Sequence, residues 1–155
     1  MVLRQDGAMS DVLTPQVRNF LATSTTCVVG TTRPDGSVRQ SVTYFLLAEV
    51  DGAECLVLST VAQRAKARDV ARTGTMSLCV FGNSAPFPAV TVEGTARVLT
   101  VAESADVGHL TRRIGREVLG FPADFELTDE QLVEADRVLL VLSPTRAYGA
   151  SYLPE

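Results

Sequence analysis

Two turn signals divide the first half of the chain into β-rich runs and constrain its fold more than any other feature. Pro34-Asp35-Gly36 joins the run 25–33 to the run 37–50, and Asp51-Gly52 leads into a third run at 54–59. Proline presets φ and glycine accepts a positive φ, so both signals are typical of tight turns between antiparallel strands. The first two runs are therefore predicted to form a hairpin.

The later pattern adds further strands and places helices around them. Hydrophobic periodicity predicts strands at 74–81, 89–101 and 137–142, with 145–152 a candidate for one more pairing. It predicts helices at 14–22, 63–73, 102–119 and 128–135. Because no alternating βαβ pattern occurs, a doubly wound parallel sheet is disfavoured. The prediction is a mainly β fold, an antiparallel barrel with peripheral helices, in one domain over 1–155 with 1–12 as a flexible N-terminal arm.

Composition excludes several classes of function. A net charge of −4 provides no basic field, which argues against nucleic acid as a partner. No apolar run approaches the roughly 18 residues of a membrane span, and residues 1–10 lack the apolar core of a signal peptide. We therefore expect a cytoplasmic protein without membrane contact. Cys27, Cys55 and Cys79 lack metal-ligand spacing and His109 is the single histidine, so no metal site is expected.

The segment 59–70 is the best candidate for chemistry. A strand ends in the hydroxyl residues Ser59 and Thr60, and a helix follows whose start carries Arg64, Lys66 and Arg68. Hydroxyl groups, first-turn N–H groups and the positive end of a helix dipole together form an anion site, and the basic side chains make phosphate a plausible guest. The alternative to an anion site is a solvent-exposed row of arginines along one side of the helix, without a ligand.

Helical geometry separates the basic residues of this segment. Arg64, Arg68 and Arg72 fall four residues apart, whereas Lys66 lies about 200° round a regular helix from Arg64. Arg64 and Lys66 can reach one phosphate only if they occupy the loop and the first turn; otherwise one of them points elsewhere. We favour Arg64 and Lys66 as phosphate ligands, Arg68 as a further candidate and Arg72 as structural.

The chain carries no catalytic motif of its own. It lacks the dinucleotide fingerprint, the P-loop and the nucleophile elbow. Its single histidine, His109, flanks the apolar stripe of a predicted helix and is interpreted as a partly exposed helix residue, so a histidine-based triad is not expected. A borrowed cofactor, or binding without catalysis, is therefore expected.

Four segments, in their order and spacing, resemble a known family. They are 27–36, 41–45, the pair 59–60 followed by 64–68, and 86–96. Over residues 14–148 the chain resembles the pyridoxamine 5′-phosphate oxidase-like split β-barrel superfamily, which includes flavin- and deazaflavin-dependent oxidoreductases. The likeness is greatest to the branch that uses coenzyme F420.

The resemblance implies a split β-barrel homodimer with cofactors at the subunit interface. It implies that Arg64 and Lys66 bind the cofactor phosphate, and that Ser59 and Thr60 make neighbouring contacts. The ring system would lie beside the strand containing Ser41, Val42 and Thr43, and the loop containing Pro86 and Phe87 would come from the other subunit. The candidates for a general acid are Tyr44 and a water molecule, and packing is the alternative role of Tyr44.

The sequence also departs from the family. Members often carry Pro-Val-Trp-Phe where this chain has Val42-Thr43-Tyr44-Phe45, so the ring pocket differs. The substrate motif Arg-x-His of true pyridoxamine phosphate oxidases is replaced by Arg146-Ala147-Tyr148, which argues against that activity.

Three functions remain open at this stage. The first is a reductase that passes a hydride from reduced coenzyme F420 to a small organic acceptor. The second is an FMN-dependent oxidoreductase on the same fold, and the third is a non-catalytic flavin or deazaflavin carrier or sensor. A longer basic groove would favour the deazaflavin with its acidic tail; its candidates are Arg33, Arg39, Arg112, Arg113 and Arg116.

Overall fold

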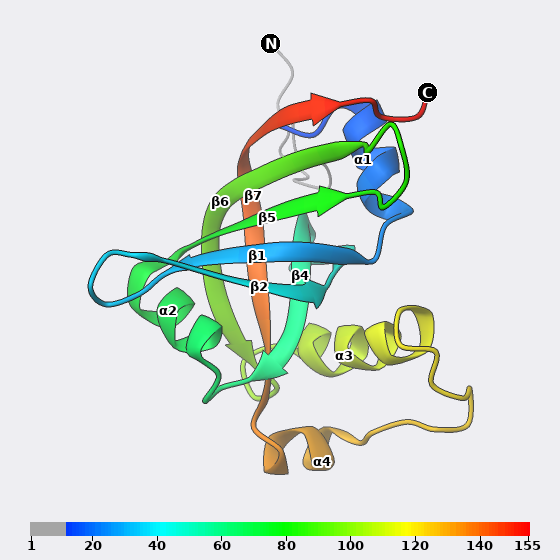
Figure 1. Cartoon of the computed structure of the whole chain (residues 1–155). Coiled ribbons are helices and arrows are strands. Elements are labelled where there is room, and N and C mark those ends of the chain that lie inside the picture. Colours follow the sequence, from blue (N-terminus) through cyan, green and yellow to red (C-terminus); the bar gives the residue numbers. More distant parts are fainter. Residues whose placement is uncertain (1–11) are drawn as a thin grey trace.

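Seven strands form one antiparallel sheet in the computed structural model, which describes residues 12–155 (Figure 1). The strands are β1 (Thr26–Thr32), β2 (Val38–Tyr44), β3 (Leu46–Val50), β4 (Ala53–Val61), β5 (Thr75–Phe81), β6 (Ala89–Thr100) and β7 (Arg137–Ser151). The helices are α1 (Pro15–Ala22), α2 (Ala65–Thr73), α3 (Ala105–Glu117) and α4 (Asp129–Glu134). The predicted mainly β fold with peripheral helices is confirmed. The predicted N-terminal arm, apart from Val12, lies outside the described residues.

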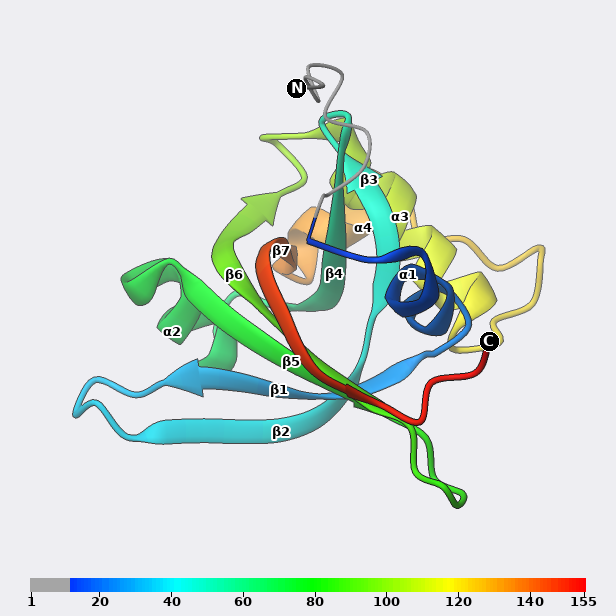
Figure 2. The ribbon, with the colours of Figure 1, turned by 90° about the horizontal axis from the view of Figure 1, so that it is seen from above.

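The sheet curls into a split barrel whose two edges are consecutive in the chain. The strand order is β2-β1-β5-β6-β7-β4-β3, so the chain passes from one edge to the other at Phe45 (Figure 2). Phe45 is fully buried and its backbone N–H donates to the carbonyl oxygen of Thr25. The single strand predicted over 37–50 is therefore wrong: it bends into β2 and β3. The bend follows from the burial of Phe45, and no glycine or proline marks it in the sequence.

Strand β7 is longer than predicted. The candidate pairing over 145–152 is confirmed, because these residues pair with β6 as far as Ser151, but the predicted end at Leu142 is wrong: β7 runs on through Pro144 as one strand. Pro144 is tolerated because the register shifts there, between Glu93 and Gly94 of β6, and a bulge does not need its missing N–H. A Cβ on Gly94 would collide with the carbonyl oxygen of Ser143, so glycine is required on the opposing strand.

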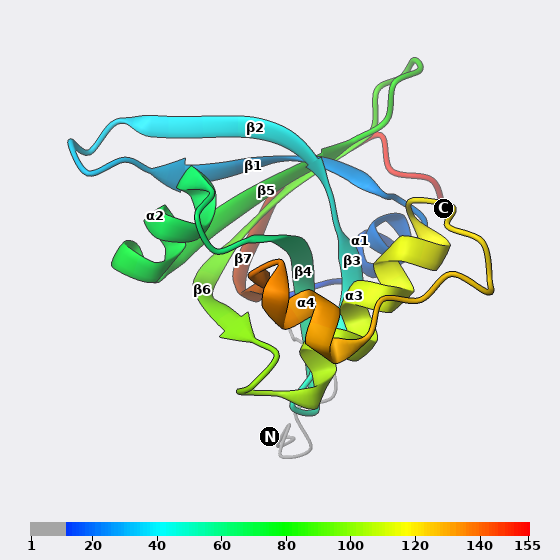
Figure 3. The same ribbon diagram turned by 90° about the horizontal axis from the view of Figure 1, so that it is seen from below.

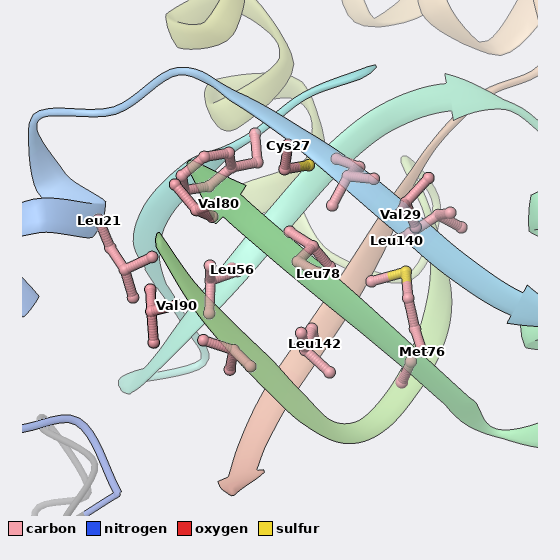
Figure 4. Close-up of a cluster of buried hydrophobic side chains, with 14 of the residues drawn as sticks. Leu21, Cys27, Val29, Leu56, Met76, Leu78, Val80, Val90, Leu140 and Leu142 are labelled. Atoms are coloured by element: carbon pink, nitrogen blue, oxygen red, sulfur yellow. The ribbon is translucent and has the colours of Figure 1, made fainter. Parts of the chain in front are cut away.

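The two faces of the sheet bury two apolar clusters. The first fills the barrel and includes Leu21, Val29, Leu56, Leu78 and Leu140, drawn together in Figure 4. The second lies between the other face of β4 and β7 and helix α3. Alternation along β4 explains the division, because neighbouring residues in a strand point to opposite faces. Most of the hydrophobic stabilisation of the fold comes from these clusters.

Local capping determines where the helices begin. Thr14 caps α1 by accepting a hydrogen bond from the N–H of Val17, as its position before Pro15 predicts. Helix α3 starts at Ala105 rather than at the predicted residue 102, because Ser104 is its N-cap and accepts from the N–H of Asp106. Among the helices of the described region, none combines the length and apolar character that crossing a membrane requires.

Candidate functional site

The junction between β4 and α2 has the geometry of an anion site. Arg64 is the N-cap of α2 with extended backbone angles, φ −63° and ψ 145°, so it lies outside the helix. The helix begins at Ala65 instead of the predicted residue 63, which puts Lys66 in the first turn. No side chain caps the start of α2, and its first turn carries no acidic residue. The N–H groups of this turn are thus left for an external acceptor.

The positive charge of this junction is not neutralised within the described residues. There, the basic side chains without a carboxylate partner are Arg33, Arg64, Lys66, Arg68 and Arg137. Three of them, Arg64, Lys66 and Arg68, lie on α2 or at its N-cap, whereas the side chain of Arg137 points to the α3 side of the sheet and donates to Ser59. A cluster of three unpaired cations beside a free helix N-terminus attracts a phosphate.

Lys66 is the half-buried member of this cluster. Burial lowers the pKa of Lys66 below its ordinary value, and the charge of Arg64 lowers it further, while Cys27 acts in the opposite direction. Cys27 is not a counter-ion, because burial raises the pKa of its thiol to about 12. The ammonium group of Lys66 therefore lacks a neutralising neighbour, and a bound anion would offset the cost of its burial.

Strand β2 presents two of the predicted residues to helix α2. Ser41 and Thr43 share a face with Arg39, whose Nε donates to Asp69 of α2 at 2.7 Å. Val42 points to the opposite face and is 71% exposed. The structure thus places Ser41 and Thr43 on the face of β2 that is turned toward α2, and Val42 on the opposite face.

The two predicted hydroxyl residues diverge. Thr60 alternates with Ser59 along β4 and lies on the same face as Leu58, toward the barrel interior. Ser59 faces the side of α3, where its Oγ accepts a hydrogen bond of 2.8 Å from Arg137. Both hydroxyl residues are buried, but only Ser59 lines the pocket that opens beside the junction.

This pocket, of about 380 Å³, lies between the sheet and the α3–α4 region. Tyr44, Ser59 and Arg137 line it from the sheet, and apolar side chains of α3 and of the following loop line it from the other side. Sequence reasoning missed Arg137, which stands at the start of β7, 78 residues from Ser59 along the chain. Only the pairing of β4 with β7 reveals that the two residues meet.

A buried carboxylate fixes helix α2 to the sheet beside the site. Asp69 is 1% exposed and accepts hydrogen bonds from Thr31, Arg39 and Arg72. Burial by itself would raise the pKa of Asp69, but the bonds from these three residues outweigh it and hold the pKa below its usual range. Arg72 is therefore structural, as predicted, since it also donates to the carbonyl oxygen of Thr32.

The residues of the β5–β6 loop do not join this site within one chain. The β5–β6 loop, which contains Pro86 and Phe87, lies at the end of the sheet opposite α2 (Figure 3), and Phe87 is 61% exposed. Their predicted place in a site formed with a second subunit stays a prediction.

Most arginines proposed for a longer basic groove are neutralised. Arg39 binds Asp69, and the three candidates of α3 bind carboxylates at 2.8–3.0 Å: Arg112 with Asp129, Arg113 with Glu117 and Arg116 with Glu126. Arg33 donates to the backbone oxygen of Val38. The unpaired positive charge is thus concentrated near the β4–α2 junction. Within residues 12–155 no group of three histidine, cysteine or acidic residues could hold a metal ion.

Comparisons with known proteins agree on one family. A family model described as pyridoxamine 5′-phosphate oxidase matches residues 13–150. A search of curated proteins finds no significant match. Among solved structures, an F420 reductase is similar with a TM-score of 0.64 and 21% identity, over 84% of this chain and 94% of that one.

Two mycobacterial structures are similar to the same extent. A conserved hypothetical protein of Mycobacterium tuberculosis has a TM-score of 0.66 and 22% identity, over 95% of this chain and 88% of that one. An FAD and heme binding protein of Mycobacterium smegmatis has a TM-score of 0.67 and 18% identity, over 94% and 75%. At these identities the structures establish the shared fold.

Proposed function

The chain belongs to the pyridoxamine 5′-phosphate oxidase family, and on that premise we propose that it is an oxidoreductase which transfers a hydride from reduced coenzyme F420 to a small organic acceptor. The observation that carries the proposal is the set of cations without carboxylate partners at the β4–α2 junction. Lys66 is half-buried there, beside the uncapped first turn of α2. These groups suit a phosphate monoester or diester.

The residues around the junction have separate roles in this proposal. Arg64 and Lys66 hold the cofactor phosphate, with Arg68 as a further contact. Ser41 and Thr43 lie beside the ring system, on the face of β2 that is turned toward α2. When bound, the reduced deazaflavin supplies a hydride, and a proton from Tyr44 or from water completes the reduction of the acceptor.

The proposed assembly is a homodimer. Its second copy brings Pro86 and Phe87 to the site, which accounts for their distance from α2 within one chain. The exposed Val42 then belongs to the dimer interface rather than to the cofactor pocket. The bond between Arg146 and Glu93, where a true pyridoxamine phosphate oxidase has its substrate motif, gives no support to that activity.

A titration of the protein with coenzyme F420 tests the phosphate assignment. We expect Lys66→Gln to weaken binding by about 1–3 kcal/mol, the range for a hydrogen bond to a charged group. The matched control is Arg113→Gln, because Arg113 is paired with Glu117 on α3 and contributes nothing to the junction. Equal affinity of the wild type and the Lys66 variant would refute the assignment.

FMN is the second candidate cofactor, and one observation favours it. The arginines of α3 are paired with carboxylates, so the free positive charge suits one phosphate better than a long acidic tail. Parallel titrations with FMN and coenzyme F420 distinguish the two. Tight binding without turnover of any acceptor would instead identify a carrier or sensor.

A further inference from the structure

The pocket between the sheet and the α3–α4 region holds a cation that nothing in the described chain neutralises. We propose that this pocket binds the organic acceptor, and that the acceptor is a planar, largely apolar molecule with a carboxylate bound by Arg137. The inference rests on the proposed function and names the class of substrate. The pocket has a volume of about 380 Å³, which falls within the usual range of small-molecule sites, roughly 300–1,000 Å³.

The walls of the pocket are apolar and aromatic. Ile114 and Leu119 line it from α3 and its C-terminal end, and Phe121 and Phe125 line it from the following loop. The two phenylalanine rings meet edge to face, with centroids 5.3 Å apart, and are 40% and 49% exposed. Exposed aromatic rings at a pocket suit a flat apolar molecule, which would cover them on binding.

The sheet side of the pocket supplies one free positive charge. Arg137 is half-buried and donates one hydrogen bond, to Ser59. A guanidinium carries five N–H donors, and a carboxylate accepts two of them in parallel. The other charged side chains lining the pocket are already paired, Arg112 with Asp129 and Glu126 with Arg116. The unmatched charge of Arg137 therefore selects an anionic ligand.

The pocket adjoins the proposed cofactor site. Tyr44 and Ser59 line it, and their side chains point to the opposite sheet face from those of Thr43 and Thr60, which adjoin them in the chain. The pocket and the cofactor site therefore lie on different faces and meet at the end of β2, an edge strand whose last residue is Tyr44. A ligand bound to Arg137 would approach the ring system round this edge. This adjacency is what a hydride transfer between two bound molecules requires.

Gly115 controls the width of the pocket. A Cβ at this position would lie 2.9 Å from Cδ2 of Phe121, so the ring packs directly on the helix backbone. Gly115→Ala should displace Phe121 and weaken every ligand of the pocket, charged or neutral.

Calorimetric titration with 2-naphthoate and its neutral analogue 2-naphthamide tests the proposal. We expect the wild type to prefer the carboxylate, and Arg137→Gln to lower its affinity about 10- to 100-fold while that for the amide stays unchanged. Retained amide binding shows that the variant is folded. Arg137→Lys should recover part of the loss, and the control Arg113→Gln should have no effect.

Failure of this inference is distinguishable from failure of the cofactor assignment. Arg137→Gln should leave the affinity for coenzyme F420 and FMN unchanged, and Lys66→Gln should leave that for 2-naphthoate unchanged. Three results would each overturn the proposal that the pocket binds a carboxylate. They are equal affinities of the wild type for the two naphthalene probes, no binding of either probe, or an Arg137→Gln variant whose affinity for 2-naphthoate equals that of the wild type.

Discussion

The charge state of Lys66 connects the site to pH. Its pKa lies below the ordinary value of about 10.4, and only the protonated amine attracts a phosphate. As pH rises through this lowered pKa, the amine becomes neutral. The affinity for FMN or coenzyme F420 should therefore begin to fall at a lower pH than it would if the phosphate were bound by an exposed lysine. Lys66→Arg should remove this alkaline loss, because a guanidinium stays protonated. Dissociation constants measured from pH 7 to 10 check both expectations.

Riboflavin provides the control for that experiment. It has the ring of FMN but no phosphate, so its affinity should not follow the ionisation of Lys66. An alkaline loss of the same size for riboflavin, or for the Lys66→Arg variant, would assign the effect to another group.

Helix α2 depends on Asp69 for its attachment to β1 and β2. Asp69→Asn keeps the shape of the side chain but removes its charge, and we expect a loss of about 1–3 kcal/mol in the free energy of unfolding at pH 7. Arg39 and Arg72 are partly exposed, so water limits the cost of their lost partner. Urea denaturation measures the difference.

The pH dependence of this loss has a definite sign. The folded-state pKa of Asp69 is lowered, so its contribution is present above the unfolded pKa of about 3.9 and disappears as pH falls through the folded value. Wild type and Asp69→Asn should therefore converge in stability below about pH 4. A difference in the free energy of unfolding that stays constant with pH would show that the contribution of Asp69 is not ionic. The control is Asp124→Asn in an exposed loop, which should change the free energy of unfolding little at any pH.

Local sequence patterns predicted some features of the helices and strands and missed others. Caps and hydrophobic periodicity predicted most helices and strands, and the predicted basic cluster stands at the uncapped start of α2; that it binds an anion stays a prediction. The bend at Phe45, the passage of β7 through Pro144 and the contact of Arg137 with Ser59 were missed. Each of these depends on which strand lies opposite, and register is a property of distant pairing that a local pattern does not contain.

The outer face of the barrel should govern association of the whole molecule. Val42, Val28, Cys79, Thr91 and Tyr148 form one row across five strands, and Val42 and Tyr148 are 71% and 45% exposed. If this face joins two copies, Val42→Arg should convert the dimer to a monomer, because it would bury an unpaired charge at the interface.

Sedimentation velocity measures that change, and α4 offers a matched control. Val133 is also an exposed valine, 56% exposed, and lies on α4 away from this row, so Val133→Arg should leave the dimer intact. A wild-type monomer, or a Val42→Arg dimer, would remove this face from consideration as the interface.

The strand order has a consequence for synthesis of the protein on the ribosome. Strand β7 lies between β6 and β4 in the sheet, yet it is the last strand of the described chain to be translated. Until it emerges from the exit tunnel, β4 and β6 each have an unpaired edge, and such edges are templates for aggregation. Closure of the sheet must therefore follow translation of residues 137–151. Nascent chains stalled before this segment should require chaperones to remain dispersed, whereas those released after it should not.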